Sequence, residues 1–326
     1  MIAAVAVVQK ARLAKALVPI LGSVVLLPVV LLGAAGGALM GGGSSQLTVD
    51  GTAAWGGDLP AEMAALYAEA AYRFVVPLGV LEAVGKVETD HCRNPLAMTP
   101  NSAGAVGCMQ FLPSTFERWA SASGSAAPSI LDPRDSVFAS AAKLSADGVA
   151  ADPWQALWAY NHSDSYVADV LAWAVAYGWR GGSRALLGRA VAGHARIAVR
   201  PSDAADLAAE LVDERVLSTL LALATRHRLA SVGPFTRHSH YVHGTSRVSN
   251  HVFGRAVDVA VVGGAPVDSG NDAARRLVVD ALTLPDDIRP SEVLSPWELR
   301  VGDAWSVTDA DHGNHVHLGF DGRSER

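Results

Sequence analysis

Cysteines are scarce in this sequence and basic residues form no concentrated block, and both shortages restrict what the protein can do. Among 326 residues there are only 2 cysteines, Cys92 and Cys108, and a metal site made from this pair alone is disfavoured because no further soft ligand lies nearby. The 26 lysines and arginines are scattered, and 32 acidic residues outnumber them. Nucleic acids bind concentrated positive charge. We therefore expect no nucleic-acid partner and a neutral or mixed-charge substrate.

Residues 1–45 have the pattern of an export segment rather than of a folded domain. Lys10, Arg12 and Lys15 precede an apolar run, residues 17–40, whose length suits a helix that spans a bilayer. Because the positive flank stays inside, the rest of the chain is predicted to lie outside the membrane. The length of the run favours a retained anchor, which predicts a single-pass protein of the cell membrane with extracytoplasmic domains. Small residues near the end of the run also suit cleavage, which would give a secreted protein.

An exported chain folds in an oxidising environment, where two cysteines in one domain favour a disulfide. We therefore predict a bridge between Cys92 and Cys108, which closes a short loop. In the chain-entropy description, such a bridge contributes roughly 3 kcal/mol to the free energy of unfolding.

After the export segment, the predicted secondary structure changes near residue 185. Residues 46–184 are predicted to be helical, and in "DPWQALWAYN" Asp152 is the expected N-cap and Pro153 the first helical residue. Residues 185–326 combine one long amphipathic helix, "DLAAELVDERVLSTLLALATRHR", with short β-rich runs such as "AVDVAVV" and "HVHLGF". The predicted fold class is α+β and multidomain: an N-terminal transmembrane helix, an all-α domain and an α+β domain.

One glutamate of the helical region lies on the apolar side of its helix. Leu81, Val84 and Glu88 recur at helical spacing, so the Glu88 carboxylate faces a core or a cleft. Burial raises the pKa of a carboxyl group, which suits a general acid that works near neutral pH. A glutamate at a helix end that is either half exposed or paired with Arg93 is the alternative.

The segments around Glu88 follow the order and spacing of a known enzyme family. They are Glu88-Thr89, Gly107-Cys108-Met109-Gln110 and Ala159-Tyr160-Asn161. On these motifs, residues 55–180 resemble the lytic transglycosylases of the soluble-transglycosylase, goose-lysozyme-like superfamily. Two positions depart from the family pattern: Thr89 replaces the usual serine and keeps the hydroxyl, and Cys108 replaces the usual leucine.

The resemblance implies cleavage of the β-1,4 bond between N-acetylmuramic acid and N-acetylglucosamine in peptidoglycan, without a cofactor. Glu88 would protonate the leaving oxygen and then accept the proton of the sugar's C6 hydroxyl, which gives a 1,6-anhydro product. The residues implied in substrate binding are Thr89, Met109, Gln110, Tyr160 and Asn161. Ordinary glycoside hydrolysis needs two carboxylates, and the motif fixes no second one, since Asp90 points to another face of the helix. A muramidase with water as nucleophile is the runner-up.

A second group of polar residues lies in the C-terminal region. Asp258 enters a predicted strand after His251, and Gly254 between them permits close backbone approach. His315 and His317 alternate along another predicted strand and so share a face. One carboxylate and imidazoles from two strands would give three ligands and an open fourth position, which is the arrangement of a catalytic zinc site.

These residues also resemble a known family. The signature Ser-x-His-x-x-Gly-x-Ala-x-Asp is present as Ser249, His251, Gly254, Ala256 and Asp258. On it, residues 190–320 resemble the LAS (M15-type) metallopeptidases, which include D-Ala-D-Ala carboxypeptidases and murein endopeptidases. The resemblance implies zinc bound by His251, Asp258 and His317, with His315 assisting the attacking water. His312 would support a ligand or the substrate, and the transition-state arginine would be Arg237, with Arg247 as a rival.

Peptidoglycan contains both kinds of bond, sugar strands and peptide stems. The two regions together therefore predict a bifunctional wall-remodelling enzyme, a lytic transglycosylase joined to a zinc-dependent D,D-peptidase. From another class, the alternative is a wall-binding or assembly protein of a secretion, conjugation or division machine, with one domain catalytically silent. Both sets of catalytic residues are present in the sequence, which favours the enzyme.

Overall fold

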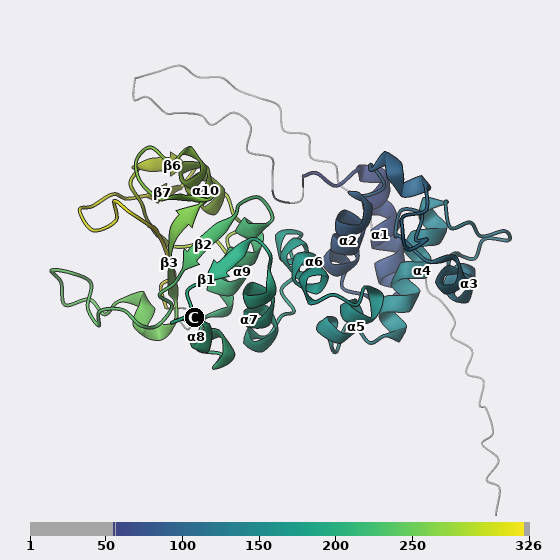
Figure 1. The fold of residues 1–326 in the computed structure, drawn as a ribbon, viewed down its shortest axis with the longest axis horizontal. Coiled ribbons are helices and arrows are strands. Elements are labelled where there is room, and N and C mark those ends of the chain that lie inside the picture. The colour runs from purple at the N-terminus through teal and green to yellow at the C-terminus, as the bar shows by residue number, and fades with distance from the viewer. Residues whose placement is uncertain (1–54, 56, 323–326) are drawn as a thin grey trace, which may run out of the picture. The chain divides into compact units, whose positions relative to one another are not determined.

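The computed structural model of this chain describes residue 55 and residues 57–322. The predicted anchor or signal at residues 1–45 lies outside the described residues. Within the described part, no helix is long and apolar enough to cross a membrane. The described chain combines a helical region with a region built on a β-sheet (Figure 1). The mixed α+β class predicted from the sequence is confirmed at this level.

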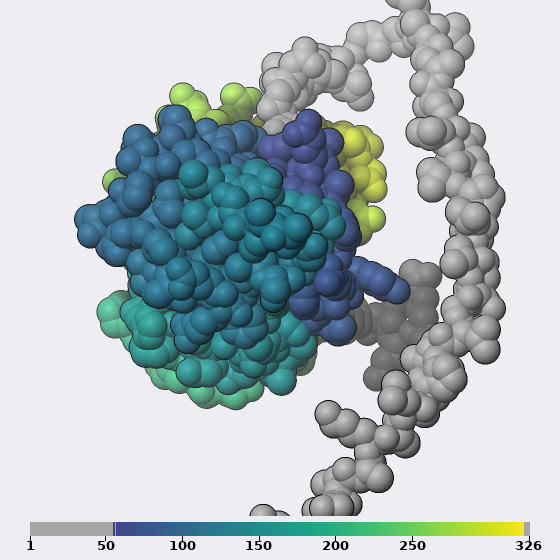
Figure 2. Space-filling view, turned by 90° about the vertical axis from the view of Figure 1, so that its right-hand side faces the viewer, coloured from purple at the N-terminus to yellow at the C-terminus, as the bar shows by residue number. Residues whose placement is uncertain are grey.

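Helices form the first region, and its surface occupies most of the face drawn in Figure 2. The α-helices are α1 (Ala61–Phe74), α2 (Leu78–Thr89), α3 (Pro113–Trp119), α4 (Pro133–Ala146), α5 (Pro153–Tyr160) and α6 (Asp164–Ala176). Two 3-10 helices, η1 (Pro95–Met98) and η2 (Ala120–Ser123), lie between them. The helices predicted from sequence are confirmed in this region.

Capping side chains explain where several of these helices begin. Asp152 accepts a hydrogen bond from the backbone N–H of Gln155, and Pro153 is the first residue of α5, as predicted. Ser163 caps α6 in the same way. Helix α6 then packs against α2, and the fully buried Leu81 and Leu171 belong to the shared core. This packing holds the C-terminal end of α2, where Glu88 lies, beside α6.

A sheet organises the second region (Figure 1). Its strands are β1 (Ile197–Val199), β2 (Leu229–Val232), β3 (Ala256–Val262), β4 (Ala265–Pro266), β5 (Glu292–Leu294) and β8 (Val316–Gly319). They follow the order β1-β2-β3-β8-β5, with β4 paired to β3. The first two strands are parallel and the other pairs are antiparallel. The predicted strands "AVDVAVV" and "HVHLGF" are confirmed as β3 and β8, and they are neighbours.

The remaining elements surround this sheet. They are α7 (Arg184–Gly193), α8 (Ala204–Ala208), α9 (Glu214–Ala224), η3 (Asn250–Phe253), α10 (Asp272–Leu282) and the hairpin of β6 (Leu299–Val301) and β7 (Ala304–Ser306). Helix α7 contacts both α6 and α9. The boundary near residue 185, which falls at the start of α7, stays a prediction.

The single long helix predicted for residues 206–228 is wrong, because the structure breaks it into α8 and α9. Between them Glu210 adopts a left-handed φ of 56°, which ends the first helix. Asp213 then accepts a hydrogen bond from the backbone N–H of Arg215 and starts the second helix. Leu211, which a continuous amphipathic helix would place on its apolar side, is 50% exposed. A backbone contact explains the break: the Asp213 N–H donates to the carbonyl of Gly254, 2.8 Å away.

Candidate functional sites

Asp258 and His317 lie directly opposite each other on the paired strands β3 and β8. His317 Nδ1 is 2.9 Å from Asp258 Oδ1, and His251, from η3, places its Nε2 3.3 Å from His317 Nδ1 and 3.4 Å from Asp258 Oδ1. The three predicted ligands therefore converge, with one donor atom each. All three side chains are buried.

The spacing of these three atoms suits a metal ion with tetrahedral coordination. Ligands about 2.0–2.1 Å from a tetrahedral zinc stand roughly 3.3–3.4 Å apart, and two of the three distances above have this length. His251 Nδ1 lies 3.3 Å from the carbonyl oxygen of Phe235, which leaves Nε2 free to bind. Two imidazoles and a carboxylate are also a donor set that zinc accepts. The residues present therefore fit a zinc ion.

Local backbone structure explains the signature that surrounds His251. Ser249 caps η3 and accepts a hydrogen bond from the backbone N–H of His251. Gly254 follows with φ of +65°, and a Cβ there would lie 1.9 Å from the carbonyl oxygen of Leu211. Only glycine permits this approach, as the sequence analysis expected. The serine and the glycine thus position the turn that delivers His251.

The pKa values of Asp258 and His317 also reflect their close contact. Burial alone would raise the pKa of Asp258, but hydrogen bonds from His251 and His317 outweigh it and hold that pKa well below its usual range. For His317, burial alone would lower the pKa, but hydrogen bonds to Asp258 and Glu292 raise it to about 9. A cation is therefore favoured beside the Asp258 carboxylate, either as the imidazolium or as a metal ion.

The other residues predicted for this site are His315, His312 and Arg237, with Arg247 as a rival. His315 Nε2 is 3.8 Å from Asp258 Oδ1, and the His312 ring is 4.8 Å from that of His315 between centroids. The Arg237 side chain is 61% exposed and its Nε is 3.8 Å from Asp206 Oδ1. Its rival Arg247 pairs with Glu292.

Sequence reasoning missed two residues beside the ligands. The His238 ring stacks on that of His251 with 4.5 Å between centroids, and His238, His251 and Asp258 each offer a ligand atom within 4.8 Å of one another. The dense histidines of "RHSHYVH" were the available signal for His238. Glu292 Oε2 is 3.5 Å from His317 Nε2. Nothing in the short run around Glu292 marks it.

Glu88 occupies the last turn of α2, half-buried, beside a tyrosine of α6. The Tyr166 hydroxyl donates a hydrogen bond to Glu88 Oε1 at 2.7 Å. Burial raises the pKa of Glu88 to about 7, although the bond from Tyr166 opposes that rise. Among the described residues, no neighbouring carboxylate contributes to the shift. Glu88 can therefore hold a proton near neutral pH, and Arg93, the alternative partner, pairs with Asp90 instead.

Two tyrosines pack beside this acid. The rings of Tyr160 and Tyr166 are stacked, with 6.5 Å between centroids and 5° between planes, and the Tyr160 hydroxyl donates to the carbonyl of Met109 at 2.9 Å. Burial, and then the charge of Glu88, raise the pKa of Tyr166 well above its usual value, so its hydroxyl stays protonated. Tyr166 was not among the predicted residues. The one feature of the sequence that could have indicated it is a tyrosine on an apolar helix, because a buried hydroxyl needs a hydrogen-bond partner.

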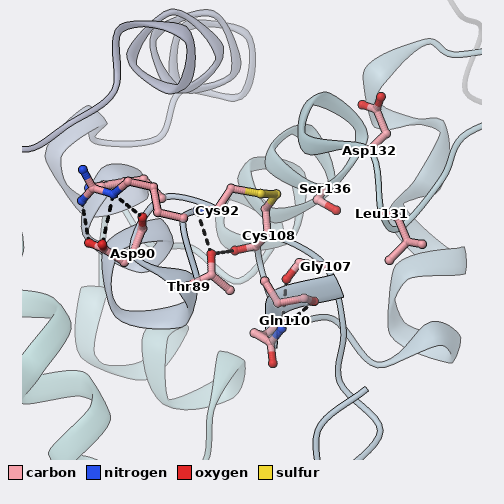
Figure 3. The surroundings of a disulfide bond; sticks show 12 residues. Thr89, Asp90, Cys92, Gly107, Cys108, Gln110, Leu131, Asp132 and Ser136 are labelled. Carbon is pink, nitrogen blue, oxygen red and sulfur yellow. Dashed lines mark hydrogen bonds and ion pairs between the residues drawn. A yellow bond between two sulfur atoms is a disulfide. The ribbon is translucent and has the colours of Figure 1, made fainter. Parts of the chain in front are cut away.

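A disulfide joins Cys92 to Cys108, as predicted, with 4.7 Å between the Cα atoms (Figure 3). Beside it, the Thr89 hydroxyl donates to the carbonyl of Cys108 at 2.6 Å and accepts from the N–H of Cys92 at 3.0 Å. Thr89 is only 2% exposed. Its hydroxyl thus connects the end of α2 to the next motif, which explains why a threonine can stand for serine.

The remaining predicted substrate-binding residues differ in accessibility. Met109 is fully buried, so with Thr89 it supports the site from inside. Gln110 is half-buried, has a left-handed φ of 47° and donates to the carbonyl of Gly107 at 3.0 Å. Asn161 is exposed at the end of α5. The structure therefore gathers Glu88, Met109 and Tyr160 closely, and leaves Gln110 and Asn161 more accessible.

One family model matches the helical region. Residues 65–175 match the family model of the transglycosylase SLT domain. The matched range contains Glu88, Gln110 and Tyr160, and ends before the sheet region. No curated protein and no solved structure was found to match the chain. The first region is therefore a helical, lytic transglycosylase-like domain, referred to below as the SLT domain.

Removing the disulfide is expected to destabilise the SLT domain. Replacing Cys92 and Cys108 together with alanine should lower the free energy of unfolding by about 2–4 kcal/mol, because the bridge restricts the unfolded chain. Thermal and urea unfolding of the full chain would measure the change. The parent protein treated with a reductant should behave like the double variant, and a variant as stable as the oxidised parent would contradict this prediction.

Proposed function

We propose that the SLT domain cleaves the β-1,4 bond between N-acetylmuramic acid and N-acetylglucosamine in peptidoglycan as a lytic transglycosylase. The observation that carries this proposal is Glu88 itself, half-buried at the end of α2, where Tyr166 donates a hydrogen bond to its carboxyl group and burial raises its pKa to about 7. Hydrolysis with two carboxylates needs a second acid across the bond. A reaction in which the sugar supplies its own nucleophile needs one group that first gives and then takes a proton.

In this mechanism, protonated Glu88 gives its proton to the glycosidic oxygen as the bond breaks. The resulting carboxylate then accepts the proton of the C6 hydroxyl, while that oxygen bonds to C1 and closes the 1,6-anhydro ring. Tyr166 donates to Glu88 Oε1 and so fixes the orientation of the carboxyl group. Gln110 and Asn161, which are accessible, would bind the sugar, and the bridge between Cys92 and Cys108 would support the Gln110 turn.

Mass spectrometry of the fragments that the full chain releases from purified peptidoglycan tests the proposal. Anhydro-muropeptides are the expected product. Reducing-end sugars would instead make the SLT domain a muramidase with water as nucleophile, the second candidate.

The pH profile of glycan cleavage should follow the ionisation of Glu88. Because the acid form gives the first proton, cleavage is expected to fall as the pH rises through about 7. Tyr166→Phe removes the hydrogen bond that lowers this pKa, so the fall should move to higher pH. Initial rates between pH 5 and pH 9, in buffers of constant ionic strength, would measure both profiles. An unchanged profile in Tyr166→Phe would contradict the assignment.

For the sheet region we propose a zinc-dependent peptidase that cuts stem or cross-link peptides, which the converging atoms of His251, Asp258 and His317 support. When bound, zinc polarises the scissile carbonyl and lowers the pKa of a water molecule. His251 and His317 would hold the ion from two sides, and the Asp258 carboxylate would balance its charge. His315, half-buried next to Asp258, would take the proton of the attacking water.

Elemental analysis of the carefully purified full chain tests the metal site. About one equivalent of zinc is expected, and less than about half an equivalent would count against it. A folded, zinc-loaded protein that releases no glycan or peptide fragment would favour the remaining candidate, a wall-binding protein of a secretion, conjugation or division machine.

We also propose that residues 17–40 anchor the chain, so that both regions face the wall outside the membrane. The apolar run and its basic flank support this orientation. Membrane fractionation and N-terminal sequencing of the mature protein would distinguish a retained anchor from a cleaved signal.

A further inference from the structure

We propose that Glu292 is a positioning residue for the ligand His317, a role that rests on the proposed metal site. Glu292 accepts the hydrogen on Nε2 of His317 and thereby leaves the lone pair of Nδ1 for the ion. A histidine has two distinct ring nitrogens, and the hydrogen bond at one of them decides which is available to a metal.

The pairing of β5 with β8 brings the two side chains together. Glu292 is opposite Gly319, and Leu294 is opposite His317, so Glu292 and His317 are diagonal neighbours across the two strands. Glu292 Oε2 lies 3.5 Å from His317 Nε2. The other ring nitrogen of His317, Nδ1, is 2.9 Å from Asp258 Oδ1, within the ligand cluster. The imidazole of His317 therefore lies between a supporting carboxylate and a ligand carboxylate.

Gly319 leaves the space in which this contact forms. A Cβ at that position would lie 2.9 Å from Glu292 Oε2 and also 2.9 Å from His317 Nε2. Its φ does not require glycine, since the residue is not among those with positive φ. A glycine inside a strand often marks a close approach of other groups. Here the approaching groups are the carboxylate and the imidazole themselves.

Two further residues hold the Glu292 carboxylate in place. Asn250 Nδ2 donates to Glu292 Oε2 at 2.8 Å, and Arg247 pairs with Glu292 Oε1. Asn250 directly precedes the ligand His251, so the same carboxylate connects the segments that deliver two of the three ligands.

Zinc affinity of the full chain, measured by competition with a chromogenic chelator, tests this role. Glu292→Gln replaces one acceptor oxygen with a donor group at nearly the same size, and is expected to weaken zinc binding by roughly 10–100-fold. Glu298→Gln is the matched control, because Glu298 is exposed and carries the same charge. Gly319→Ala should weaken binding as well, since the added methyl group separates Glu292 from His317.

A spectroscopic readout separates positioning from general stability. Nitrogen NMR of the zinc-loaded parent, with labelled histidine, should show a proton on Nε2 of His317 and none on Nδ1. In Glu292→Gln this Nε2 signal should broaden or shift, while the circular dichroism spectrum and the unfolding temperature of the full chain stay at parent values and show that the sheet region is folded.

The possible outcomes are distinct. Parent-like affinity in both Glu292→Gln and Gly319→Ala would overturn the role of Glu292 and leave the metal site standing. An equal loss in Glu298→Gln would also overturn it, since total charge would then explain the effect. Failure of the parent to bind zinc would overturn the metal site and this role together.

Discussion

Glu88→Gln is expected to reduce the release of anhydro-muropeptides by about 10²–10⁴-fold, the range that a general acid contributes. The amide has nearly the same shape but can neither give a proton to the glycosidic oxygen nor accept one from the C6 hydroxyl. Tyr166 can still donate to the amide oxygen, so little change in folding is expected. Product quantification by mass spectrometry, with circular dichroism to confirm folding, measures this effect.

Glu117→Gln provides the matched control for that experiment. Glu117 lies in α3 of the same domain, is exposed, and loses the same charge on substitution. Its cleavage rate should equal that of the parent. A Glu88→Gln protein that keeps more than a tenth of the parent rate would show that another group is the acid.

His317→Ala is expected to reduce bound zinc from about one equivalent to almost none and to abolish peptide cleavage, because two ligands hold an ion far less tightly than three. The substitution also leaves Asp258 with one partner fewer in a buried position. Elemental analysis and mass spectrometry of released peptides would measure the two losses.

His243→Ala is the control for the metal experiment. The His243 side chain is 88% exposed and pairs with Asp311, outside the three ligands. Zinc content and peptide cleavage should stay at parent values. Full zinc occupancy in His317→Ala would contradict the ligand assignment, as would peptide cleavage at the parent rate.

Measuring both activities in both variants assigns each reaction to its domain. Glu88→Gln should keep peptide cleavage, and His317→Ala should keep the release of anhydro products. Loss of both activities in either variant would contradict two independent sites.

Local patterns in the sequence predicted much of the first site. Helical periodicity placed Glu88 on the inner face of α2, and cysteine count together with export predicted the bridge to Cys108. Tyr166 was missed because it reaches Glu88 from 78 positions away, a contact that only the packing of α6 against α2 creates. Periodicity describes one element at a time and carries no information about its neighbours.

In the sheet region, too, the contacts that form the site join elements far apart in the sequence, which local patterns do not predict. The strands β3 and β8 were predictable from their composition, but their pairing joins Asp258 to His317 across 59 positions. The break between α8 and α9 depends on a hydrogen bond from Asp213 to Gly254, which overrides a good helical pattern. Glu292 was missed because β5 has three residues and offers no period to detect.

The bridge beside Thr89 has a consequence for when the protein becomes able to cut. In a reducing compartment the two thiols stay separate, and the hydrogen bond from the Thr89 hydroxyl to the carbonyl of Cys108 remains without the covalent bridge beside it. Oxidation completes that junction (Figure 3). With the export proposed above, we therefore expect the acid and its supporting turn to reach their final arrangement only outside the cell, so that a reduced chain would be a poor lytic enzyme.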